Sequence, residues 1–220
     1  FNASNNLDYF RETGFLPPNN QKQTVQIIPN WYTKPYIAPQ PDTDGTQRFS
    51  ILYSGNMSDR FDWELLTTLA KRLDNADIHI VGGAARAQDK LERLLAETNV
   101  TYWGVLPEER LVRLIERCHL GIVPHVSDKV SAFMNPLKIE MYNALGLPVV
   151  TTAIDGIGGA DGTDGLRVCT SHEDFIATVL AFKARHEAND LERLKTANEM
   201  PASARAFVDL LIDAFGTLDG

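Results

Sequence analysis

A lysine at the start of an expected helix is the residue of this chain whose position most strongly suggests chemistry. Lys138 follows Pro136, whose fixed φ suits the first turn of a helix. The N–H groups of a first helical turn lack intrahelical partners and carry a partial positive charge, to which the lysine adds a full one. This combination suits a phosphate or a diphosphate. A lysine simply exposed to solvent is the alternative, because many α/β domains contain helices of this kind.

Glycines and one arginine in other loops extend this candidate site. Gly55 allows close approach of the backbone to a ligand, and Arg60 could pair with diphosphate oxygens. The loops 82–83 and 104–107 could frame a nucleobase, because backbone N–H and C=O groups can read its edge while apolar side chains cover its face. Each feature has an ordinary alternative: Gly55 and the two loops as plain turns, and Arg60 as a solvated charge.

These residues are expected to be held by an alternation of strands and helices over residues 49–187. Short apolar runs predict strands at 51–53, 78–81, 100–103, 120–124, 149–150 and 166–168. Apolar residues at helical spacing predict helices at 61–73, 86–97, 108–117, 136–145, 172–187 and 203–215. This pattern predicts an α/β fold with a doubly wound, Rossmann-like parallel sheet that is covered on both faces.

In such folds ligands bind at the carboxyl ends of the strands. The loops expected at that edge are 54–60, 82–86, 104–107, 125–135 and 153–165. The candidate residues above all lie in these loops or directly after one of them, so the topology is expected to bring them together.

The composition limits the class of protein. The chain has 220 residues, of which 44% are hydrophobic, which is enough for one large α/β domain. A net charge of −8 argues against a nucleic-acid partner, because phosphate backbones are bound by clustered lysine and arginine. Cys118 and Cys169 lie outside any Cys-x-x-Cys unit, so reduced, buried thiols are expected. The histidines lack metal-ligand spacing, and no apolar run has the length of a membrane span.

The order of the segments resembles that of GT-B glycosyltransferases, in the group 1 or GT4-like set with a pattern similar to N/S-P-L-K-x-x-E-Y-x-A-x-G-x-P-V-V. The resemblance covers about residues 25–187. The matching segments, in family order, are 27–30, 53–55, 61–66, 81–82, 104, 121–124, 135–138 and 146–150. Within them, residues 135–138 and 146–148 are the specific ones.

The resemblance implies a domain organisation in which this chain is the C-terminal half of a GT-B fold. Residues 1–30 would be a remnant of the N-terminal acceptor domain with the hinge, and 31–48 a linker. Residues 49–190 would form the nucleotide-sugar-binding domain, and 191–220 a helix that crosses back towards the first domain. Because the chain starts at Phe1 within apparent structure, we expect it to be a piece of a longer protein. The closing helix carries an apolar stripe formed by Phe207, Leu210, Leu211 and Phe215. Part of this stripe is expected to be exposed, to rest on residues 1–20 or to be covered by a second copy of the chain. The alternative is a helix that caps the sheet of its own domain.

The resemblance also implies a hexosyltransferase that binds a UDP- or GDP-sugar. The donor-binding residues that it implies are Gly55, Asn56, Arg60, Val105, Leu106, Asn135, Lys138, Glu140 and Met141. Lys138 would hold the diphosphate with Arg60 as a second cation, Gly55 and Asn56 would face the phosphates or the acceptor, and Val105 and Leu106 would meet the base. No metal is expected. The catalytic residue is left unassigned, since the family's catalytic base usually lies in the domain missing here.

One position departs from the family pattern. The family has a glutamate three residues after the lysine, where it grips the ribose hydroxyls, and this chain has Met141 there. The acid lies one residue earlier, at Glu140, which is about 100° away around a helix. Either Glu140 reaches round, or the ribose is held by other groups, or donor binding is weaker.

The resemblance finally implies partners and a location. We expect a nucleotide sugar, a glycan or lipid-linked acceptor and the missing N-terminal domain as partners, in a bacterial enzyme of polysaccharide biosynthesis. A cytoplasmic location is expected, at the inner face of the membrane if the missing domain associates with it. Two alternatives stay open: a nucleotide-sugar epimerase of GT-B fold, and a non-enzymatic nucleotide-binding or interaction domain.

Overall fold

The computed structural model describes residues 48–126, 137–153, 165–192 and 202–215, together with Glu12, Tyr32, Gly162 and Leu194. The candidate residue Asn135 and most of the segments 1–30 and 31–48 lie outside the described residues, as do the side chains at both ends of the last helix.

Six parallel strands form one sheet in the order β3-β2-β1-β4-β5-β6. Their bounds are β1 Phe49–Ser54, β2 Ala76–Val81, β3 Val100–Tyr102, β4 Leu120–Val123, β5 Val149–Thr152 and β6 Leu166–Cys169. The strand order reverses between β1 and β4, which makes the sheet doubly wound, as expected. The predicted α/β, Rossmann-like fold class is therefore confirmed.

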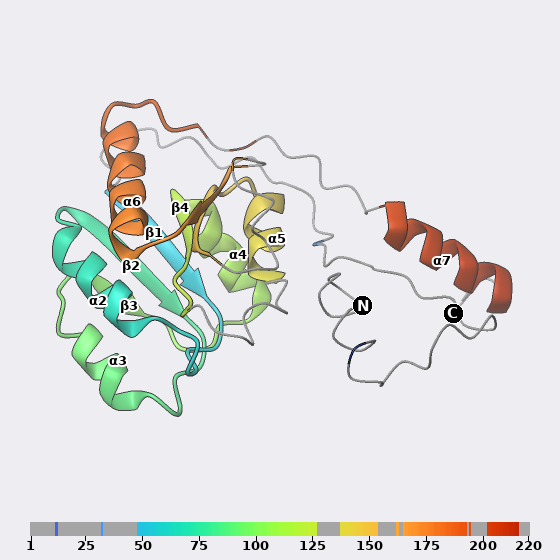
Figure 1. Ribbon diagram of the computed structural model, residues 1–220, viewed down its shortest axis with the longest axis horizontal. Coiled ribbons are helices and arrows are strands. Elements are labelled where there is room, and N and C mark those ends of the chain that lie inside the picture. The colour runs from blue at the N-terminus through green and yellow to red at the C-terminus, as the bar shows by residue number, and fades with distance from the viewer. Residues whose placement is uncertain are drawn as a thin grey trace.

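Helices cover both faces of this sheet, as Figure 1 shows. Their bounds are α2 Trp63–Arg72, α3 Gln88–Leu94, α4 Glu108–Arg117, α5 Leu137–Ala144, α6 His172–Glu187 and α7 Ala202–Phe215. Helices α2, α3 and α6 pack on one face around a large apolar cluster, and α4 and α5 pack on the other face around a second cluster.

Capping residues fix where the helices begin and end. Asp62 accepts a hydrogen bond from the backbone N–H of Leu65 at 2.9 Å at the start of α2. Ser171 accepts one from the N–H of Asp174 at 3.1 Å at the start of α6. Gly146 follows α5 with a φ of 72°, a left-handed conformation that allows the chain to turn back into β5.

Helix α7 lies apart from the sheet and its covering helices in Figure 1. Three members of its expected apolar stripe are exposed: Phe207 by 37%, Leu210 by 53% and Leu211 by 39%. Exposure of part of the stripe is one of the three expected arrangements. The crossing of this helix to another domain stays a prediction.

Candidate functional site

A cavity of about 630 Å³ opens at the carboxyl edge of the sheet. Its walls come from the loops that follow β1, β2 and β3 and from helices α4 and α5. Five of the residues predicted to bind a donor line it together: Gly55, Val105, Leu106, Lys138 and Met141. The topology therefore brings together predicted residues as far apart in the chain as Gly55 and Met141, which are 86 positions apart.

Backbone packing of three glycine loops forms the floor of this cavity. The N–H of Gly55 donates to the carbonyl of Val81 at 2.9 Å, and the N–H of Gly82 donates to the carbonyl of Gly104 at 2.8 Å. Gly82 has a φ of 132°, and a Cβ there would lie 1.9 Å from the carbonyl oxygen of Gly55. Only glycine fits this contact, so Gly82 brings the loops after β1 and β2 together.

Lys138 crosses over Gly55 and reaches Tyr53. Its Nζ lies 4.3 Å from the centroid of the Tyr53 ring and donates to the Tyr53 hydroxyl at 3.2 Å. A Cβ on Gly55 would come within 2.6 Å of this Nζ, so the glycine leaves the space through which the lysine passes. The same Nζ lies 3.4 Å from Nε2 of His125.

The environment of Lys138 disfavours its charge. Burial, reinforced by the positive charge of Arg60, lowers the pKa of Lys138 to about 7. Within the described residues, the groups in contact with its ammonium are a tyrosine ring, a tyrosine hydroxyl and a histidine, and none of them is a carboxylate. A bound anion would supply the missing negative charge, so this site favours an anionic ligand.

Tyr142 of α5 forms hydrogen bonds with the last residue of β1. Its hydroxyl accepts a hydrogen bond from the N–H of Ser54 at 2.7 Å and lies 2.8 Å from the Ser54 side chain. Burial raises the pKa of Tyr142, so the hydroxyl keeps its proton. Gly121 provides room for the ring, because a Cβ there would lie 2.5 Å from the ring atom Cδ2. Tyr142 therefore positions the strand end that leads into Gly55.

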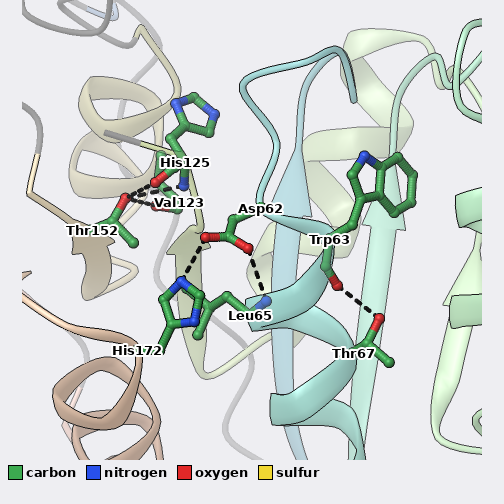
Figure 2. Close-up of polar contacts among 8 residues, drawn as sticks. All are labelled: Asp62, Trp63, Leu65, Thr67, Val123, His125, Thr152 and His172. Carbon is green, nitrogen blue, oxygen red and sulfur yellow. Dashed lines mark hydrogen bonds and ion pairs between the residues drawn. The ribbon is translucent and has the colours of Figure 1, made fainter. Parts of the chain in front are cut away.

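His125 is anchored through its backbone by β5. Its N–H donates to the hydroxyl of Thr152 at 3.0 Å, and that hydroxyl donates to the carbonyl of His125 at 2.6 Å (Figure 2). Nearby, Nε2 of His172 lies 2.7 Å from Oδ2 of Asp62 (Figure 2). This contact joins the beginning of α6 to the beginning of α2, and the N–H of Asp62 in turn donates to the carbonyl of Pro124 at 2.9 Å. The network fixes the loop that presents His125 to Lys138.

Three other predicted donor-binding residues are described but do not line the cavity. Arg60 lies close enough to influence the pKa values of Tyr53 and Lys138. The carbonyl of Asn56 accepts a hydrogen bond from the Tyr53 hydroxyl at 3.2 Å, next to the cavity floor. Glu140 is partly exposed on α5, whereas Met141 faces the cavity and is 9% exposed.

The cavity also has lining residues that the sequence did not single out: Tyr32, Glu108, Leu111 and Leu137. Tyr53 and His125 are likewise new as neighbours of Lys138, although Tyr53 lies in one of the family-like segments and His125 begins an expected polar loop. Their contacts with Lys138 join residues 85 and 13 positions apart, which no local pattern indicates.

Two properties of the described residues concern metals and membranes. Among them, no group of three or more histidine, cysteine, aspartate or glutamate side chains is arranged to hold a metal ion. None of the helices in this described part of the chain has both the length and the apolar character needed to span a membrane.

The sequence of the sheet and its covering helices matches a known protein family. Residues 48–183 match the family described as glycosyl transferases group 1, and the chain belongs to this family. This membership favours a glycosyltransferase domain over the epimerase and the non-enzymatic alternatives. No curated protein matches the sequence.

Solved structures show the same fold at low sequence identity. The chain resembles sucrose-phosphate synthase from Thermosynechococcus elongatus, with 17% identity and a TM-score of 0.65, over 97% of this chain and 57% of that one. It resembles Anabaena HepE, solved in complex with UDP and glucose, with 16% identity and a TM-score of 0.64, over 96% and 62%. WaaG, a glycosyltransferase involved in lipopolysaccharide biosynthesis, matches with 15% identity and a TM-score of 0.62, over 98% and 62%. The chain therefore spans about three fifths of the length of these GT-B proteins.

Proposed function

We propose that this chain is the donor-binding part of a hexosyltransferase and that its cavity binds a UDP- or GDP-sugar. The observation that carries the proposal is Lys138, a largely buried cation at the carboxyl edge of a parallel sheet, beside glycine loops and an apolar cavity. A nucleoside diphosphate combines a dense negative charge with a flat, largely apolar base. The volume of about 630 Å³ lies in the range of small-molecule sites.

The order of the cavity walls suggests how the donor lies. The diphosphate would meet Lys138 and the backbone at Gly55, where the segments after β4 and β1 come together. Arg60 adds a second positive charge near this point. The base would lie towards the segment after β3, where Val105 and Leu106 line the cavity. The two cations would balance the charge of the diphosphate, and we propose that donor binding needs no metal.

Transfer needs an acceptor across the donor site. We propose that a further domain supplies the acceptor site and the catalytic base, so that this chain alone has no turnover. We propose that the acceptor is a glycan or is lipid-linked and that the enzyme acts in bacterial polysaccharide biosynthesis. The resemblance to WaaG, a glycosyltransferase involved in lipopolysaccharide biosynthesis, supports this class of acceptor. We propose a location in the cytoplasm, at the inner face of the membrane. The UDP and glucose in the HepE complex support a UDP-hexose as donor.

Isothermal titration calorimetry with UDP, GDP and ADP, each with and without EDTA, tests this function. Lys138→Ala should weaken binding of the preferred diphosphate by about 1.5–3 kcal/mol, the range for a hydrogen bond to a charged group. Lys90→Ala is the matched control, because Lys90 is exposed on α3 and does not line the cavity. Equal affinities of the wild type and Lys138→Ala would refute the assignment, and loss of binding in EDTA would refute the metal-free site.

A further inference from the structure

The donor cavity has a second charged end, formed by Glu108 at the start of α4. Among the described residues that line the cavity, Glu108 carries the acidic side chain and Lys138 the basic one. Between them the cavity is lined by apolar side chains, among them Leu111 and Met141. The cavity therefore offers a cation and a carboxylate that are separated by an apolar surface.

Tyr32 holds this carboxylate. Its hydroxyl donates a hydrogen bond to Oε1 of Glu108 at 2.8 Å, across 76 residues of sequence. Burial first, and then the hydrogen bond and charge of Glu108, raise the pKa of Tyr32, so the phenol keeps its proton and remains a donor. Tyr32 itself packs against the apolar cluster under α4 and α5. Although Glu108 is on an exposed helix end, its side chain is thus fixed at the cavity wall by a phenol.

We propose that Glu108 accepts hydrogen bonds from the ribose hydroxyls of the nucleotide and that Tyr32 positions it for this role. The inference rests on the proposed function. A nucleoside diphosphate has its ribose between the diphosphate and the base, and the ribose presents two neighbouring O–H donors. A carboxylate has about four lone-pair sites, so it can accept from a phenol and from hydroxyls at the same time.

The composition of α5 explains why this role falls to α4. Met141 occupies the cavity wall of α5 and offers only a thioether, a weak acceptor. Glu140 does not line the cavity. A ribose bound between α4 and α5 therefore meets an apolar surface on α5 and its strong acceptor on α4.

Affinities for UDP and 2′-deoxy-UDP, or for GDP and 2′-deoxy-GDP if guanine is preferred, test the inference. The wild type should prefer the ribonucleotide by about tenfold or more, the scale of a hydrogen bond to a charged group. Glu108→Gln should reduce this preference towards one by weakening ribonucleotide binding and leaving deoxyribonucleotide binding unchanged. Tyr32→Phe should reduce it less, because the carboxylate stays but loses its fixed position. Glu109→Gln, one residue along on an exposed position outside the cavity wall, should keep the full preference.

The outcomes separate the two proposals. If the wild type binds both nucleotides equally, or if Glu108→Gln keeps the wild-type preference, Glu108 does not recognise the ribose and the inference is wrong, while the donor site at Lys138 stands. If Glu108→Gln weakens both nucleotides by the same factor, the carboxylate acts on another part of the ligand, and the inference is again wrong. If no nucleoside diphosphate binds to the wild type, the proposed function fails and the inference fails with it.

Discussion

Raising the pH from 7 to 8.5 should weaken the binding of a nucleoside diphosphate, because Lys138 loses its proton in the free protein. Burial and the charge of Arg60 lower the pKa of Lys138 to about 7. A bound diphosphate places negative charge beside the ammonium and raises its pKa, so that the bound lysine stays protonated. Binding at higher pH must therefore include the uptake of a proton, which lowers the apparent affinity.

The magnitude follows from the fraction of Lys138 that is charged. With a pKa of about 7, half of the side chains are charged at pH 7 and about 3% at pH 8.5, a fall of about 16-fold. The dissociation constant should rise by the same factor, which corresponds to about 1.6 kcal/mol. The ligand contributes little to this change, because the second pKa of a phosphate monoester is about 6.

Calorimetric titrations at constant ionic strength measure the effect, and Lys138→Arg is the control. Arginine keeps its charge throughout this range, so the variant should bind with an affinity that is nearly constant from pH 7 to 8.5. A wild-type affinity that is also constant over this range would refute the reasoning, because Lys138 would then be charged before the ligand arrives or would not touch it.

The same pKa shift has a consequence for the stability of the free protein. The folded-state pKa of Lys138 lies below its unfolded value of about 10.4, so the unfolded chain binds more protons between these values. The destabilisation by the charged lysine is fully present below about pH 7 and is lost as the pH rises towards about 10. Relative to Lys138→Met, the wild type should gain on the order of 1–2 kcal/mol between pH 7 and 9, a value discounted for solvent contact. Urea unfolding of both proteins measures this difference, and parallel stability curves would contradict it.

Three further substitutions test other parts of the site. Gly82→Ala should destabilise the fold by roughly 2–3 kcal/mol, because the new Cβ meets a backbone oxygen in addition to the strain of a positive φ. Gly104→Ala shares the positive φ but has open space around its Cβ, so it should cost less. Equal unfolding midpoints of the two variants would contradict this. Asp62→Ala should lower the free energy of unfolding in urea by about 1–2 kcal/mol, since it removes a helix cap and the contact with His172. If His172→Ala lowers this free energy by as much, the cap contributes nothing. Met141→Glu should either tighten the binding of a nucleoside diphosphate or destabilise the fold, and a variant unchanged in both respects would show that this position does neither.

Local signals in the sequence predicted the elements of the fold closely. The helices expected at 108–117 and 172–187 have these bounds in the structure, as α4 and α6. Acidic residues in the first turn of each helix, and the Ser171 cap of α6, stabilise these starts. The helix expected at 86–97 is shorter, Gln88–Leu94, because residues 95–99 form turns that lead into β3. The strands followed from their apolar runs, since a parallel sheet covered on both faces buries nearly all of their side chains.

The order of the segments predicted which residues lie at the site, but not the contacts between their side chains. Lys138 and the glycine loops could be placed at one edge of the sheet, because strand ends meet there. The contact of Lys138 with Tyr53, and that of Tyr32 with Glu108, depend on side-chain packing between distant parts of the chain. Patterns of sequence spacing indicate neighbours within one helix or strand, so they could not indicate these pairs.

A crystal structure of the chain with the preferred nucleoside diphosphate tests the central claim most directly. We expect phosphate oxygens within about 3 Å of Nζ of Lys138 and the base against Val105 and Leu106. A nucleotide bound instead in the groove of about 570 Å³ lined by Lys71 and Lys90, on the α2 and α3 side of the sheet, would contradict the donor site described here.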